Sequence, residues 1–160
     1  MWLAAPWLVT VRNPANGPDG GGYIGALHDL GPVPLWVDWY TWPARELVPC
    51  DALLVRGTGS QGTDDLRRSL DRIGRGRPDP YPDPAPDPAE FVLAMVPLAA
   101  KFVARGRHEH AAAMAAMLGA PPDPSPLEGL RSVLSPIRGH ARARRLVERY
   151  LEVVAAIVAG

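Results

Sequence analysis

The chain has 160 residues, a size typical of one domain or two small lobes, and its 17 Lys and Arg residues balance 17 Asp and Glu residues. Because the net charge is zero, we expect neither nucleic acid nor a membrane surface as a partner attracted by general charge. A single cysteine, Cys50, excludes an internal disulfide and a cysteine-based zinc site, which fits a cytoplasmic protein. The apolar run 153–160 is far shorter than the ~20 residues that span a bilayer, and the N-terminal run 1–9 lacks the basic start of a signal peptide.

Residues 1–77 have the pattern of a small lobe of strands and turns. Four short runs rich in aliphatic, β-branched or aromatic residues, separated by Gly- and Pro-rich turns, predict strands at 8–11, 23–28, 35–40 and 52–55. A polar helix is expected at 63–73, with Thr63 as its N-cap and acidic residues in its first turn.

Residues 78–88 have a proline at every second position, which favours an extended linker. Beyond the linker, residues 89–160 predict a helical bundle, with helices at about 88–105, 107–118, 126–134 and 139–159. The first and third helices begin with the same signature, an Asp or Ser followed by Pro and, two residues later, by Glu. The expected fold class is α+β: a partial sheet, mixed or antiparallel, followed by a bundle of about four helices.

Asp38 is the first candidate for a functional residue. In the strand predicted at 35–40, side chains alternate between two faces, and Trp36, Asp38 and Tyr40 share one face. A carboxylate between two aromatic side chains carries a desolvation cost unless the charge is paired or used. The alternative is that Asp38 lies on a solvent-facing position near the end of the strand.

The residues around Asp38 also carry a family resemblance. It rests on the segments Asn13-Pro14-Ala15-Asn16, Gly20-Gly21-Gly22-Tyr23, His28-Asp29-Leu30-Gly31-Pro32-Val33-Pro34-Leu35 and Val37-Asp38-Trp39-Tyr40-Thr41-Trp42-Pro43. Together they resemble the later part of the catalytic lobe of bacterial minimal nucleotidyltransferases. These belong to the polymerase-β-like superfamily, which includes the aminoglycoside nucleotidyltransferases.

This resemblance implies a phosphoryl-transfer function. In the family, a nucleoside monophosphate passes from a nucleoside triphosphate to a hydroxyl of a small-molecule acceptor, and two Mg²⁺ ions hold the triphosphate and the attacking oxygen. Three carboxylates hold the metal ions, and Asp38 matches the third. A helical domain follows the catalytic lobe in the family, as it is expected to do here.

The sequence departs from the family at the other two carboxylates. These lie two residues apart on one strand, after a Gly-Ser turn, whereas no two acidic residues here are two positions apart and the only Gly-Ser pair, Gly59-Ser60, follows Asp38. We therefore expect a truncated or degenerate nucleotidyltransferase, with the missing motif upstream of Met1, that is an enzyme only if that motif is supplied. The alternative is a non-catalytic binding module derived from the same fold, acting as a homodimer or with a partner protein.

Glu90 is a second candidate for the site. Some family members place a general base on their helical domain, and the resemblance implies that Glu90 takes this role. The preferred alternative is that Glu90 is the N3 residue of a capping box whose N-cap is Asp87.

Four other motifs have structural explanations that we prefer. The run Gly57–Gly62 has the glycine spacing of a dinucleotide-binding loop, but a proline-rich linker follows where a second central strand is needed. His108 and His110 are two residues apart, so they face different sides of a helix and are not a metal pair. The basic run 138–149 and the tryptophans at 36–42 are expected to form a solvated helix face and a core or interface, respectively.

Arg105 and His110 provide a minor alternative. Their four intervening residues match the spacing of the HEPN ribonuclease motif, and HEPN proteins are partners of minimal nucleotidyltransferases. A match of this kind is expected by chance in a chain with 16 Arg and four His residues, so we keep it only as an alternative.

Overall fold

The computed structural model describes residues 7–13, 16–18, 20–44, 46–52, 60–74, 87–121 and 125–160. The chain divides into two compact units. The helical unit contains Met1–Val11, Ala26–Val37 and Pro86–Gly160, and the small unit contains Arg12–Gly25 and Asp38–Ala85. The helical unit thus includes segments that the sequence assigns to the first lobe. Most of the predicted proline linker lies outside the described residues.

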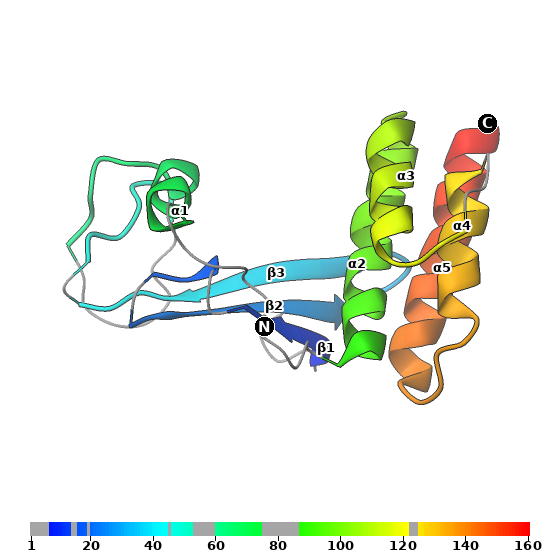
Figure 1. The fold of residues 1–160 in the computed structure, drawn as a ribbon, viewed down its shortest axis with the longest axis horizontal. Helices are drawn as coiled ribbons and strands as arrows, with labels where there is room; N and C mark the ends of the chain where they lie inside the picture. The colour runs from blue at the N-terminus through cyan, green and yellow to red at the C-terminus, as the bar shows by residue number, and fades with distance from the viewer. Residues whose placement is uncertain are drawn as a thin grey trace. The chain divides into compact units, whose positions relative to one another are not determined.

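Three strands form one antiparallel sheet, in the order β1-β2-β3 (Figure 1). Their bounds are Trp7–Arg12 for β1, Gly22–Asp29 for β2 and Pro34–Thr41 for β3. These positions confirm the strands predicted at 8–11, 23–28 and 35–40. The fourth predicted strand, at 52–55, lies outside the described residues except for Ala52, which belongs to no strand.

The polar helix of the small unit is α1 (Leu66–Gly74), and it begins later than predicted. The Asp65 carboxylate accepts a hydrogen bond from the Arg68 backbone N–H at 2.8 Å, and the Asp51 carboxylate accepts one from the Leu66 N–H at 2.6 Å. The prediction of Thr63 as the N-cap is therefore wrong. Two carboxylates satisfy the first N–H groups of the helix, and their negative charge is favourable at a helix N-terminus.

Four helices form the bundle of the helical unit, as predicted (Figure 1). They are α2 (Pro88–Ala104), α3 (His108–Met117), α4 (Pro126–Leu134) and α5 (Ala141–Ala159). Helix α2 packs against each of the other three. It begins as the sequence indicates, because the Asp87 carboxylate accepts a hydrogen bond from the Ala89 N–H at 2.8 Å. The α+β fold class is thereby confirmed.

Glycines end both α2 and α3. After α2, Gly106 has φ +69°, and the N–H groups of Gly106 and Arg107 donate to the carbonyls of Val103 and Phe102 at 2.9 and 2.8 Å. The same pair of hydrogen bonds follows α3, where Gly119 has φ +84°. Both ends are Schellman motifs, which require a residue in the left-handed region and so favour glycine.

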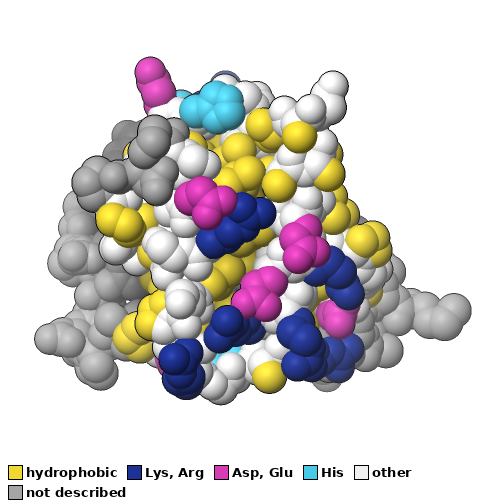
Figure 2. All heavy atoms as spheres, turned by 90° about the vertical axis from the view of Figure 1, so that its right-hand side faces the viewer, with side chains coloured by type: hydrophobic (Ala, Val, Ile, Leu, Met, Phe, Trp, Pro, Cys, Tyr) yellow, Lys and Arg dark blue, Asp and Glu magenta, His cyan; other side chains and the backbone are white. Residues whose placement is uncertain are grey.

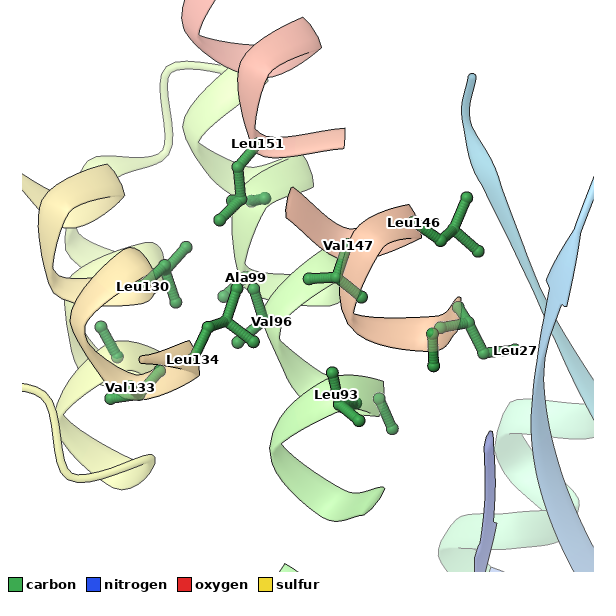
Figure 3. Close-up of a cluster of buried hydrophobic side chains, with 14 of the residues drawn as sticks. Leu27, Leu93, Val96, Ala99, Leu130, Val133, Leu134, Leu146, Val147 and Leu151 are labelled. Atoms are coloured by element: carbon green, nitrogen blue, oxygen red, sulfur yellow. The ribbon is translucent and has the colours of Figure 1, made fainter. Parts of the chain in front are cut away.

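The core of the helical unit joins the bundle to parts of the sheet (Figure 3). Leu93, Leu130, Leu146 and Leu151 are at most 2% exposed and come from α2, α4 and α5. Val9, Val11 and Leu27 add apolar side chains from β1 and β2 to the same cluster. Burial of one such side chain contributes about 1.5–3 kcal/mol, so this shared core stabilises both the helices and the strand ends that pack with them.

Candidate functional site

Asp38 lies on β3, within the small unit, and its side chain is exposed. The Tyr23 hydroxyl, from the neighbouring strand β2, donates a hydrogen bond of 2.7 Å to Oδ1 of Asp38. A hydrogen bond from a hydroxyl to a carboxylate fixes the orientation of the carboxylate and is stronger than one between neutral groups. Asp38 was predicted from the sequence as a candidate for the site, whereas Tyr23 was not.

A second tyrosine completes this group. Tyr40 is two residues from Asp38 on β3, and its ring lies 5.3 Å from the Tyr23 ring, measured between centroids, at an interplanar angle of 51°. Burial, and next the negative charge of Asp38, raise the pKa of Tyr40 to about 12. We call Tyr23, Asp38 and Tyr40 the Asp38 cluster. At neutral pH it offers one carboxylate held by a phenol and a second phenol that stays protonated.

The Asp38 cluster does not by itself form a complete magnesium centre. Across the described part of the chain, no group of three or more His, Cys, Asp or Glu side chains is placed to hold a metal ion. Mg²⁺ takes oxygen ligands in octahedral geometry, and the family's two-metal arrangement uses three carboxylates. Asp38 alone does not fit that arrangement, so no step of a metal-dependent reaction follows from these residues.

Glu90 lies in the first turn of α2 and is half-buried. It belongs to the helical unit, whereas Asp38 belongs to the small unit. The hydrogen bond from the Ala89 N–H to Asp87 shows that Asp87 caps this helix, but it does not involve the Glu90 side chain, so the capping-box explanation of Glu90 stays a prediction. The role of Glu90 as a general base stays a prediction.

The glycine run at 57–62 is described only from Ser60 onward. There, Val48 donates to the Ser60 carbonyl at 3.0 Å and accepts from the Gly62 N–H at 2.7 Å. The next helix, α1, has N–H groups at its start that already donate to the carboxylates of Asp51 and Asp65. A phosphate at this helix start would have to displace two carboxylates, which argues against a nucleotide-binding loop.

The tryptophans of β3 and the following turn contribute to packing. Trp36 packs against the core of the helical unit. The indole nitrogens of Trp39 and Trp42, in the small unit, are buried. These positions agree with the structural explanation that the sequence favoured over stacking on a ligand.

The basic run on α5 is largely paired within the protein. Both Nε and Nη2 of Arg142 donate to Oδ2 of Asp29, at 3.3 and 3.2 Å, and Nη2 of Arg149 lies 3.6 Å from Oδ1 of the same carboxylate. Arg149 also donates to the Gly31 carbonyl at 2.5 Å, and Arg144 pairs with Glu148 at 2.7 Å. On the face in Figure 2, Asp and Glu side chains lie among the Arg and Lys side chains. Arg142 and Arg149 nevertheless stay 57% and 49% exposed, so the run is a solvated helix face, as predicted, and it also pairs with the β2–β3 turn.

No protein-family model, no curated protein and no solved structure matches this chain. Among the helices that the structure describes, none combines the length and the apolar character needed to cross a membrane. The family resemblance therefore rests on the sequence segments given above.

Proposed function

We propose that this chain is a nucleotidyltransferase-like protein in which Asp38 supplies one carboxylate to a nucleotide-binding metal site. The observation that carries the proposal is the Asp38 cluster: an exposed carboxylate on a strand, held at 2.7 Å by the Tyr23 hydroxyl. The α+β arrangement of a sheet followed by a four-helix bundle is consistent with the proposal. The acceptor would be a small molecule with a hydroxyl group.

The two further carboxylates that the family uses would have to come from another segment or another chain. Asp38 would then contribute one oxygen ligand to Mg²⁺, and Tyr23 would hold the carboxylate in a fixed orientation. A phenol that donates to one carboxylate oxygen leaves that group less freedom to rotate, which reduces the entropy lost on binding a ligand.

The test is magnesium-dependent binding of ATP or GTP to the full chain, measured by isothermal titration calorimetry. The proposal predicts binding that requires Mg²⁺ and is lost in Asp38→Asn. Asp71→Asn is the matched control, because it removes the same charge from an exposed position of the same unit. Equal binding by wild type and Asp38→Asn would refute the role of Asp38.

The second candidate is a non-catalytic binding or dimerisation module. The observation in its favour is that no metal-binding group of three side chains lies within the described residues. Sedimentation equilibrium, together with the calorimetric titration, distinguishes the two candidate functions. A stable oligomer that binds neither ATP nor GTP with Mg²⁺ supports the binding or dimerisation module. A monomer that binds nucleotide with Mg²⁺ supports the first proposal.

A further inference from the structure

A concentration of positive charge lies where α2 ends and α3 begins. Its basic side chains are Lys101, Arg105, Arg107, His108 and His110, and we call this group the basic corner. All are exposed except Lys101, which is half-buried. Glu109 is the only acidic residue between positions 101 and 110.

One aromatic ring organises the corner. The Nζ of Lys101 lies 5.6 Å from the Phe102 ring centroid and the Cζ of Arg107 lies 5.3 Å from it, distances at which cations are attracted to a ring. The His110 ring lies 5.6 Å from the same ring. Two cations and an imidazole therefore all lie beside the Phe102 ring.

A hydrogen bond fixes the guanidinium of Arg107 further. Its Nη2 lies 2.7 Å from Nε2 of His110. A guanidinium has only donors, so Nε2 of His110 is the acceptor in this hydrogen bond. Because Arg107 is held by both the ring and the imidazole, it loses little side-chain freedom on binding a ligand.

Within the described part of the chain, the cations of the corner have no carboxylate partner. Among the described residues, no carboxylate lies within 4.0 Å of a charged nitrogen of Lys101, Arg105 or Arg107, whereas Arg142 and Arg149 share Asp29. Like charges gathered on a short stretch of chain repel one another. A bound anion would relieve that repulsion.

The start of α3 adds to the positive potential. Arg107 is the N-cap residue of α3, and its side chain makes no capping hydrogen bond. The first N–H groups of a helix have no partner within the helix and carry partial positive charge. The Schellman turn at Gly106 places this helix start directly beside the end of α2.

We propose that the basic corner binds the phosphoryl group of a small phosphorylated molecule. A phosphoryl group has several acceptor oxygens and carries more negative charge than a carboxylate, so it matches a guanidinium fork together with an ammonium group. The neutral net charge of the chain and the small extent of the corner favour a small ligand over a nucleic acid. The inference is independent of the proposed function, since it requires neither Asp38 nor Mg²⁺.

The experiment titrates the full chain with inorganic phosphate, pyrophosphate and ATP in the presence of EDTA, by calorimetry and by NMR of the backbone amides. Pyrophosphate should bind and perturb the amides of residues 105–110. Arg107→Gln and Lys101→Gln should each weaken binding by about tenfold or more, because hydrogen bonds to charged groups are lost. Arg145→Gln removes one exposed charge from α5 and should change affinity by less than about twofold.

Far-ultraviolet circular dichroism verifies that the variants fold. Binding of phosphate alone, or of ATP with its phosphates at the corner, would identify the source of the phosphoryl group within the proposal. Failure of all three ligands to bind would overturn it. So would equal loss of binding in Arg107→Gln and Arg145→Gln, or binding of an RNA oligonucleotide at the corner without binding of pyrophosphate. Since EDTA removes Mg²⁺, none of these outcomes depends on the Asp38 site.

Discussion

Replacing Asp38 by Asn should lower the pKa of Tyr40. In the wild-type protein, burial and the Asp38 charge together raise this pKa from 10.0 to about 12, and burial is the larger cause. Loss of the negative charge makes the tyrosinate easier to form, so the direction is downward. Because the smaller cause is removed, the pKa should move less than halfway back from about 12 towards 10.0.

NMR of ring-labelled tyrosine measures this change, since the chain has only four tyrosines and Tyr40→Phe assigns the signal. Tyr150, whose pKa is also raised by burial, is the internal control and should not respond to Asp38→Asn. Tyr23→Phe tests the geometry separately, because it removes the hydrogen bond to Asp38 but keeps the charge. An unchanged or increased pKa of Tyr40 in Asp38→Asn would refute the electrostatic link between the two residues.

The same pKa predicts how stability depends on pH. Folded Tyr40 keeps its proton to a higher pH than unfolded Tyr40, so its contribution to stability is complete below pH 10.0 and is lost as the pH rises towards about 12. A difference of about 2 in pKa corresponds to about 2.7 kcal/mol, and solvent screening of this half-buried group reduces it to about 1 kcal/mol. Urea unfolding across this pH range should show that loss in the wild type relative to Tyr40→Phe. If the free energy of unfolding changed with pH in parallel for the wild type and Tyr40→Phe, this prediction would be contradicted.

Three further changes test the helical unit, each by urea unfolding. Leu93→Ala should lower the free energy of unfolding by about 2–5 kcal/mol, because Leu93 is 0% exposed within the shared core. A loss below about 1 kcal/mol would contradict the assignment of Leu93 to a tightly packed core. Asp87→Ala should cost about 1 kcal/mol through loss of the α2 cap, with Asp87→Ser as the rescuing variant. Gly119→Ala should cost about 1–2 kcal/mol because of its φ of +84°. Steric overlap is not the cause there, since nothing lies within 4 Å of the added Cβ.

The helices and strands were predictable because their signals are local. Asp87 followed by Pro88 marks the start of α2, and Gly106 and Gly119 mark the ends of α2 and α3. The start of α1 was mispredicted because one of the two carboxylates at this helix start comes from a distant residue. The Leu66 N–H donates to Asp51, which lies 15 positions earlier in the chain. Which segments belong to the helical unit depends on contacts between the sheet and α5, such as the cluster that contains Leu27 and Leu146. No local sequence pattern predicts these contacts.

The candidate site was predictable only in part. Asp38 was singled out because a carboxylate between aromatic side chains was expected to be desolvated, but Asp38 is exposed in the structure, so that reason does not hold. Tyr23 was missed because it belongs to another strand, β2. The register in which β2 pairs with β3 would have identified it. If Asp29 and Pro34 flank the turn as a facing pair, counting back along both strands places Tyr23 opposite Tyr40, in agreement with their ring contact.

Two basic segments look alike in the sequence and differ in the structure. The run on α5 meets Asp29, whose carboxylate lies 113 positions before Arg142, so its charge is compensated by a residue that no local pattern reveals. The basic corner has only Glu109 among its near neighbours in sequence, and its three cations at 101–107 have no carboxylate partner in the described part of the chain. Charge density alone therefore does not identify an anion site. The position of the counter-charges decides which basic segment is available to a ligand, and it favours the junction of α2 and α3 over α5.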